Sequence, residues 1–99
     1  MKRDDDLIRA ILLALEAQAT APGDWIEHER LLPEKDRRSV NYHVYLLHDG
    51  GYIFAETEAR NLLSNQYKYY DPKCLTSKGH DFLDAIRDDE IWKRTKAAA

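Results

Sequence analysis

The first stretch of the chain, from Asp4 to about Ala19, has the hydrophobic periodicity of an amphipathic helix. Carboxylates at its start, from Asp4 to Asp6, suit a helix N-terminus, where they cap free backbone N–H groups and complement the helix dipole. The run of residues 20–24, Thr-Ala-Pro-Gly-Asp, then predicts the end of the helix. The apolar residues of its predicted buried stripe are Leu7, Ile8, Ile11, Leu12 and Leu15.

A second amphipathic pattern predicts a helix from about Arg37 to His48, with Asp36 as its N-cap. Its inward stripe is Val40, Val44 and Leu47, with His43 at the edge. At about 100° per residue, the opposite face carries Arg38, Tyr42 and Tyr45, with Asn41 beside them. Gly50-Gly51 predicts a left-handed stop at the C-terminal end.

The segment between these helices has weaker signals. Residues 25–28, Trp-Ile-Glu-His, predict a short strand, and Leu31 and Leu32 are expected to turn inward in a turn or short helix. Pro33 ends whatever precedes it or opens a new turn.

Two β-prone stretches follow the second helix and predict an antiparallel hairpin. The first is Tyr52–Thr57, and the second starts at Tyr67–Tyr70 and continues through Asp71-Pro72 to Leu75. Residues 58–65 form the loop between them, and Pro72 indicates an edge position or a bulge.

A third helix is predicted after Leu75, capped by Thr76 or Ser77, with Phe82, Leu83 and Ile86 as its apolar stripe. Gly79 would allow a close backbone approach near its start. The acidic run 88–90 is expected to interrupt the helix before Ile91-Trp92, and residues 92–99 are expected to fray. We expect Trp92 to pack against the first helix; a homodimer through the terminal helices is the alternative.

The order of these elements predicts an α+β fold of the winged helix-turn-helix type. It has three main helices and a small antiparallel β-hairpin wing, in a single domain over residues 1–99. In that fold the outward face of the middle helix can enter the DNA major groove, and the hairpin loop can lie on the DNA backbone.

Three blocks of sequence strengthen this interpretation: residues 1–4 and 6–9 at the start, Tyr42-His43-Val44 with Leu46-Leu47 in the centre, and Leu75-Thr76 with residues 79–89 and Ile91-Trp92 at the end. Together they resemble the small bacterial and phage family catalogued as domain of unknown function 2513, over essentially the whole chain. The resemblance implies a winged-helix-like fold and a bacterial or prophage origin, and it implies no activity. His48-Asp49-Gly50, where members often have an alanine and an acidic residue before the glycine, departs from the family pattern, as does the hairpin loop.

Composition narrows the class of protein. The chain of 99 residues is 43% hydrophobic and 33% charged, which is typical of a folded domain. No apolar run approaches the roughly 20 residues of a membrane span, and the charged start lacks the features of a signal peptide. With Cys74 as its one cysteine, the chain cannot form an internal disulfide, and we expect a cytoplasmic protein.

The charge distribution bears on the partner. A net charge of −3 opposes strong non-specific binding of nucleic acid. Positive charge is nevertheless concentrated where the second helix begins. The leading hypothesis is therefore a DNA-binding module, such as a small phage-related transcriptional regulator. The residues expected to contact double-stranded DNA are Lys35, Arg37, Arg38, Asn41, Tyr42 and Tyr45 from the helix, with Arg60, Lys68 and Lys73 from the wing.

The alternative is a protein-interaction adaptor that keeps the winged-helix scaffold without binding DNA, which the net charge and the acidic residues between 24 and 34 favour. The four histidines show no metal-ligand spacing, and His43 and His80 are expected to be buried or half-buried with a hydrogen-bonded ring nitrogen. Cys74 is expected to be a small core residue. The sequence therefore predicts no enzyme, no metal site and no cofactor.

Overall fold

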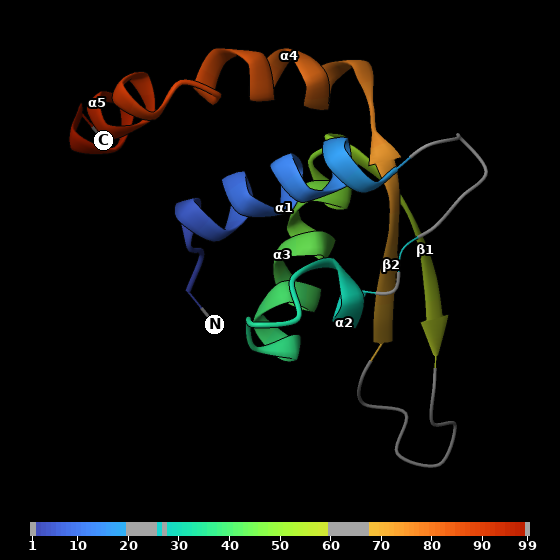
Figure 1. Ribbon diagram of the computed structural model, residues 1–99. Helices are drawn as coiled ribbons and strands as arrows, with labels where there is room; N and C mark the ends of the chain where they lie inside the picture. The colour runs from blue at the N-terminus through green and yellow to red at the C-terminus, as the bar shows by residue number, and fades with distance from the viewer. Residues whose placement is uncertain (1, 20–25, 27, 60–67, 99) are drawn as a thin grey trace.

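Five helical segments and a two-stranded antiparallel sheet make up the described part of the chain, so that the fold class is α+β (Figure 1). The computed structural model describes residues 2–19, 26, 28–59 and 68–98. Helices α1, α2 and α3 come first, the strands β1 and β2 follow, and α4 and α5 end the chain.

Helix α1, Asp5–Gln18, confirms the first predicted helix and its cap. The carboxylate of Asp4 accepts hydrogen bonds from the backbone N–H groups of Asp6 and Leu7, which would otherwise have no partner within the helix. The predicted stripe is buried against the rest of the molecule at all five of its positions: Leu7, Ile8, Ile11, Leu12 and Leu15.

The expected strand at residues 25–28 is wrong at His28, because this residue begins the single turn of α2, His28–Leu31. One strand-like contact is present: the backbone N–H of Ile26 donates to the carbonyl oxygen of Pro72 at 2.8 Å. Trp25 and Glu27 lie outside the described residues. Leu31 is buried, as expected, and Leu32 is partly buried.

Helix α3, Arg37–Asp49, confirms the second predicted helix, and Asp36 caps it by accepting from the backbone N–H of Ser39 at 3.1 Å. Val40, Val44 and Leu47 are buried, as their spacing predicts. The left-handed residue after the helix is Gly51, with φ of 81°, whereas Gly50 stays in the right-handed region. Only the second glycine of the pair therefore uses its conformational freedom at this stop.

His43 lies fully buried on α3 and joins it to the start of the chain. Its Nδ1 lies 2.6 Å from the carbonyl oxygen of Ser39, and its Nε2 accepts from the backbone N–H of Asp4 at 2.8 Å. Because a carbonyl can only accept and an N–H can only donate, Nδ1 carries the proton. The expectation of a buried, hydrogen-bonded histidine is confirmed for His43 and wrong for His80, which is exposed.

Strands β1, Ile53–Ala59, and β2, Lys68–Leu75, form the predicted hairpin. The register shifts between Phe54, which pairs with Cys74, and Ala55, which pairs with Pro72, so that Lys73 is the extra residue of a bulge. This bulge confirms the expectation attached to Pro72, whose nitrogen has no hydrogen to donate to a neighbouring strand. Cys74 is only partly buried, so it is less enclosed than a core residue.

Helix α4, Ser77–Ile86, starts at the predicted cap Thr76, whose hydroxyl accepts from the backbone N–H of Gly79 at 3.1 Å. Gly79 is buried against the backbone of Tyr52, and a Cβ at this position would overlap the carbonyl oxygen of Tyr52. The close approach predicted for Gly79 is confirmed, and it fixes where α4 crosses the start of the hairpin.

The expectation of a frayed tail is wrong for residues 92–98, because helix α5 spans Asp89–Ala98; Ala99 lies outside the described residues. The interruption before it is confirmed: α4 ends at Ile86, and Asp88 caps α5 by accepting from the backbone N–H groups of Glu90 and Ile91. Trp92 is buried, and its indole N–H donates to the carboxylate of Asp6 at 2.8 Å. This confirms that Trp92 packs against the first helix.

Helices α4 and α5 together cover one side of α1, while α3 and the hairpin lie on its other side (Figure 1). The guanidinium of Arg9 joins the two parts of this cover by donating to the carbonyl oxygens of Ile86 and Arg87 and to the carboxylate of Asp89. The side of α3 that faces away from α1 is therefore left without a covering helix from the described residues.

Candidate nucleic-acid interface

The exposed face of α3 carries Arg38, Tyr42 and Tyr45, at spacings of four and three residues that place them on one side of the helix. Arg38 is exposed and Tyr42 half-buried, and 38% of the Tyr45 surface is accessible. The predicted outward direction of these three residues is thus confirmed. Large aromatic side chains that stay accessible on a helix face offer contact area to a partner.

The exposed tyrosines continue onto the hairpin. The ring centroids of Tyr45 and Tyr70 lie 5.2 Å apart, and those of Tyr42 and Tyr45 lie 6.2 Å apart. We call Tyr42, Tyr45 and Tyr70 the tyrosine cluster. Because Tyr70 belongs to β2, the cluster joins the surface of α3 to that of the hairpin.

Asn41, expected to lie beside these residues on the outward face, does not belong to this surface. Its side chain is 5% exposed, and its Oδ1 accepts from the backbone N–H of Tyr70 at 2.8 Å. The cause is tertiary: Asn41 lies on the flank of α3, and β2 runs along that flank. Its amide group therefore fixes the hairpin to the helix.

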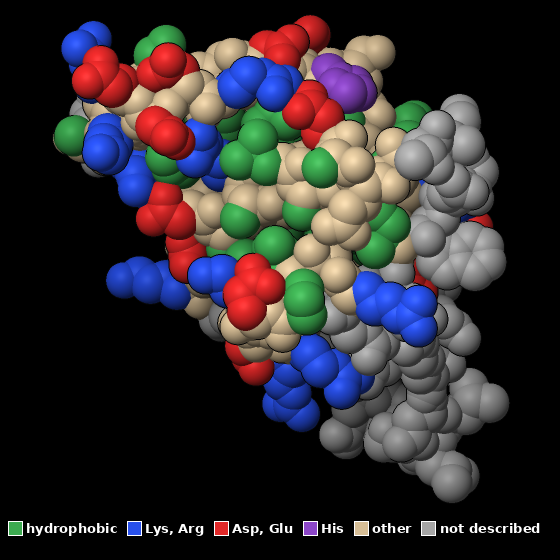
Figure 2. Space-filling view, viewed as in Figure 1, with side chains coloured by type: hydrophobic (Ala, Val, Ile, Leu, Met, Phe, Trp, Pro, Cys, Tyr) green, Lys and Arg blue, Asp and Glu red, His purple; other side chains and the backbone are tan. Residues whose placement is uncertain are grey.

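Basic side chains gather at the end of the molecule where α2 is followed by the start of α3. Figure 2 shows Lys and Arg side chains at this end, with acidic ones among them. Lys35 and Arg37 are exposed there, as predicted, and Arg30 on α2 is exposed beside them in sequence. We call Arg30, Lys35, Arg37 and Arg38 the basic turn.

Of the three hairpin residues predicted to contact phosphate, the structure describes the side chain of one. Lys73 lies in the bulge and forms an ion pair with Glu56 at 2.9 Å, which neutralises its charge locally. Lys68 begins β2, but its side chain lies outside the described residues, as does all of Arg60. The structure therefore gives no geometry for the wing contacts of Arg60 and Lys68.

Sequence reasoning missed two members of this surface. Arg30 was not among the residues expected to contact DNA, although its place next to Leu31, which was expected to turn inward, was a signal that it points outward. Tyr70 was assigned to a strand, and no local pattern indicates that its ring meets Tyr45, because the two residues come together only through the hairpin.

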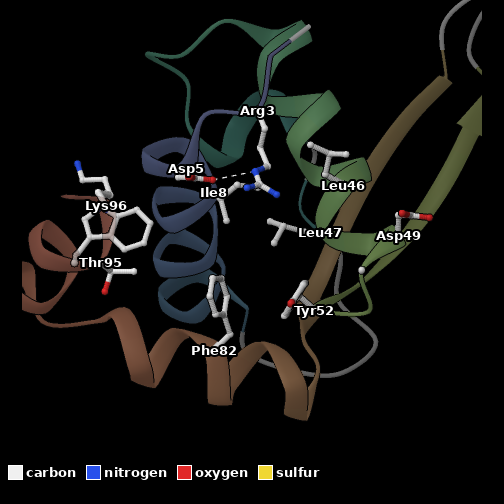
Figure 3. A pocket seen from close by; sticks show the side chains of 12 residues that line it. Arg3, Asp5, Ile8, Leu46, Leu47, Asp49, Tyr52, Phe82, Thr95 and Lys96 are labelled. Carbon is white, nitrogen blue, oxygen red and sulfur yellow. Dashed lines mark ion pairs between the residues drawn. The ribbon is translucent and has the colours of Figure 1, made fainter. Parts of the chain in front are cut away.

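A separate cleft of about 430 Å³ lies on another side of α3, between α1, α4 and α5 (Figure 3). Ile8, Leu47 and Phe82 form part of its apolar lining. Arg3 and Asp5 lie at its rim and pair with each other at 3.0 Å. Sequence reasoning did not predict this cleft, since four helices that are distant in the chain contribute to it.

The titratable groups with displaced pKa values lie where α1 contacts α4 and α5, away from the exposed face of α3. Hydrogen bonds from Lys96 and Trp92 lower the pKa of Asp6, and a hydrogen bond from Arg87 lowers the pKa of Glu16. Glu16, together with Asp84, raises the pKa of Arg87. These shifts accompany the ion pairs of Lys96 with Asp6 and of Arg87 with Glu16, which link α1 to α5 and to the end of α4. Within the described residues, no three His, Cys, Asp or Glu side chains are arranged to hold a metal ion.

Comparison with known proteins adds the family. The model of the family described as "Hypothetical protein (DUF2513)" matches residues 2–99. The chain belongs to the DUF2513 family. The resemblance of its three sequence blocks to this family is therefore confirmed.

The DUF2513 chain is also similar to a protein of Haemophilus influenzae (strain ATCC 51907 / DSM 11121 / KW20 / Rd) with the printed name "Uncharacterized protein". The two are 40% identical over 100 residues, which cover 97% of the DUF2513 chain and 76% of the relative. No solved structure matches the chain. In the described part of this DUF2513 protein, none of the helices has the length and apolar character needed to cross a membrane.

Proposed function

We propose that this chain is a winged-helix module that binds double-stranded DNA, as a small bacterial or phage regulator would. The order of α1, α2, α3 and the hairpin fits the winged-helix layout. The hydrogen bond from the backbone N–H of Ile26 to the carbonyl oxygen of Pro72 adds support, because it brings Ile26 beside the outer edge of β2. That is where the short first strand of a winged helix would pair with the wing.

One observation carries the proposal: the exposed face of α3 is continuous with the basic turn at one end and with the hairpin along its side. A helix of this kind can enter a major groove of about 12 Å width, with its N-terminal residues nearest the base edges. Arg38, Tyr42 and Tyr45 would then face the bases, and Arg30, Lys35 and Arg37 would contact phosphates.

The net charge of −3 fits this proposal if the acidic side chains lie on other faces. Within residues 30–38, the four cations of the basic turn outnumber the two exposed carboxylates, Glu34 and Asp36. A basic end of this kind would be turned toward DNA by the negative potential of the duplex. Helices α4 and α5 and the link between them carry no net charge, because five exposed carboxylates are balanced by five Lys and Arg side chains.

A titration of fluorescently labelled random-sequence duplex, followed by anisotropy at low salt, tests the proposal. Replacing both Arg37 and Arg38 by Glu is expected to weaken binding at least about tenfold. The slope of log K against log salt should become shallower by about one for each lost phosphate contact. The matched control replaces Lys93 and Arg94 by Glu, which makes the same change in net charge on α5.

The proposal requires that the α3 variant lose affinity and that the α5 control bind like the unmodified chain. Equal losses of affinity in the two variants would show that binding responds to the net charge of the chain and not to the position of the charge on α3. Absence of binding by the unmodified chain at tens of micromolar would reject DNA as the partner.

The second candidate, a protein-interaction adaptor, is favoured by exposed apolar side chains away from α3. Phe54 on β1 is 55% exposed and Ile91 on α5 is 48% exposed. With Trp92 buried, Ile91 is the side chain that a dimer through the terminal helices would use. Analytical ultracentrifugation of the unmodified chain and of the Ile91→Asp variant tests that dimer: only the unmodified chain should associate.

A further inference from the structure

We infer that the tyrosine cluster recognises the C5-methyl group of thymine in the major groove, so that the protein prefers thymine-containing sites through apolar contact. This inference rests on the proposed DNA-binding function and names the base feature that the exposed face of α3 would detect.

Asn41 is not placed to contact a base by hydrogen bonds from the exposed face of α3. Asn is the side chain that forms paired hydrogen bonds with adenine in the major groove. Asn41 is buried, and its Oδ1 is occupied by the backbone N–H of Tyr70. From Arg38 to Tyr45, the exposed face of α3 therefore presents one guanidinium followed by two phenol rings.

Neighbouring groups hold the rings of the tyrosine cluster in place. Tyr45 packs against Tyr42 on its own helix and against Tyr70 on β2, at centroid distances of 6.2 and 5.2 Å. The backbone of Tyr70 is in turn fixed by Asn41. Aromatic side chains that are held in place before binding lose little conformational entropy when a partner arrives.

The tyrosine cluster and the C5-methyl group of thymine are both apolar, so they can form an apolar contact in the major groove. The thymine methyl is the apolar group that a base pair exposes in the major groove, and side-chain recognition of thymine uses it. Tyr45, the most accessible ring of the tyrosine cluster, lies one helical turn beyond Tyr42 and two beyond Arg38, along the face that would enter the groove. Removing one methyl from such a contact is expected to cost about fourfold in affinity.

The experiment compares a DNA duplex of alternating adenine and thymine with the same DNA duplex in which deoxyuridine replaces every thymidine, at the same salt concentration. The two differ only in the C5-methyl group. We expect the unmodified chain to bind the thymine duplex about fourfold more tightly for each methyl contacted. The Tyr45→Ala variant should bind both duplexes equally, and Tyr45→Phe should keep the preference because the ring remains.

The control variant is Phe54→Ala, which removes an exposed aromatic side chain from β1 and should leave the preference intact. Circular dichroism of each variant establishes that it is folded before binding is compared. If the unmodified chain binds both duplexes with equal affinity, the inference is overturned and the DNA-binding function stands. If it binds neither duplex, the inference is overturned too, and the titration with random-sequence duplex shows whether the DNA-binding function fails with it.

Discussion

The side-chain oxygen of Asn41 on α3 accepts a hydrogen bond of 2.8 Å from the backbone N–H of Tyr70 on β2, 29 residues further along the chain. The N–H of Tyr70 points away from β1, and Asn41 supplies the acceptor that the sheet does not. This bond also fixes the position of the hairpin beside the helix. The residue with the side chain best suited to contact adenine thus sets the geometry of the surface and lies beneath it.

Replacing Asn41 by Leu, which has a similar volume, is expected to lower the free energy of unfolding by about 1–3 kcal/mol. The reason is that the partly buried N–H of Tyr70 loses its acceptor. Urea denaturation followed by circular dichroism measures the change. Lys35→Ala, an exposed position just before α3, serves as the control and should stay within about 0.5 kcal/mol of the unmodified chain. Equal stability of the two variants would contradict the anchoring role of Asn41.

Replacing the buried His43 by Leu is expected to destabilise the fold by about 1–3 kcal/mol, because the N–H of Asp4 loses its acceptor at the start of α1. His48→Leu, at an exposed position on the same helix, should change stability by less than about 0.5 kcal/mol. Thermal unfolding of both variants makes the comparison. A His43→Leu variant that is as stable as His48→Leu would show that the bond between α3 and the chain start contributes nothing.

The two glycines Gly79 and Gly51 should respond differently to alanine. A methyl group at Gly79 would overlap the carbonyl oxygen of Tyr52, so Gly79→Ala is expected to cost about 1–3 kcal/mol or more despite the helix preference of alanine. Gly51 has open space around it but a φ of 81°, and Gly51→Ala should cost only about 1 kcal/mol of backbone strain. Urea midpoints of the two variants rank them, and the reverse order would contradict the close approach at Gly79.

The contact of α5 with α1 should depend on pH through Asp6. Hydrogen bonds from Lys96 and Trp92 hold the pKa of Asp6 below its ordinary value of 3.8 in the folded protein. The stabilisation is therefore fully present above about pH 3.8 and is lost as the pH falls through the lower pKa of the folded state. Trp92 fluorescence, recorded in a Trp25→Phe background, should change over that range.

The same titration on Asp6→Asn provides the control for this pH dependence. Asparagine cannot ionise, so the component that belongs to Asp6 should disappear, while the carboxylate of Glu16, which is paired with the permanently charged Arg87, continues to titrate. An identical acid transition in the two proteins would show that Asp6 does not control how α5 is held.

The features that sequence predicted well are those that neighbouring residues determine. The caps Asp4, Asp36 and Thr76 were predicted because a capping side chain bonds backbone groups only two or three residues away. The apolar stripes of α1 and α3 were predicted because their periodicity identifies the buried face directly.

The features that sequence did not predict depend on partners distant in the chain. Residues 92–98 contain one large apolar side chain, Trp92, so no apolar stripe predicts where they pack; hydrogen bonds from Trp92 and Lys96 to Asp6, 86 and 90 residues away, hold α5 against α1. Asn41 has the helical position of a flanking, accessible residue, and only the arrival of β2 buries it. The tyrosine cluster likewise required the placement of Tyr70, which no spacing along the chain indicates.

The most direct test of DNA binding by α3 is to map the binding surface by nuclear magnetic resonance, with a ¹⁵N-labelled chain titrated with a short duplex at low salt. If the exposed face of α3 binds DNA, the largest amide shift changes fall on Lys35, Arg38, Tyr42 and Tyr45, and α5 around Trp92 is almost unaffected. Changes concentrated on α4 and α5, or none at duplex concentrations well above the protein concentration, would contradict the claim that the exposed face of α3 binds DNA.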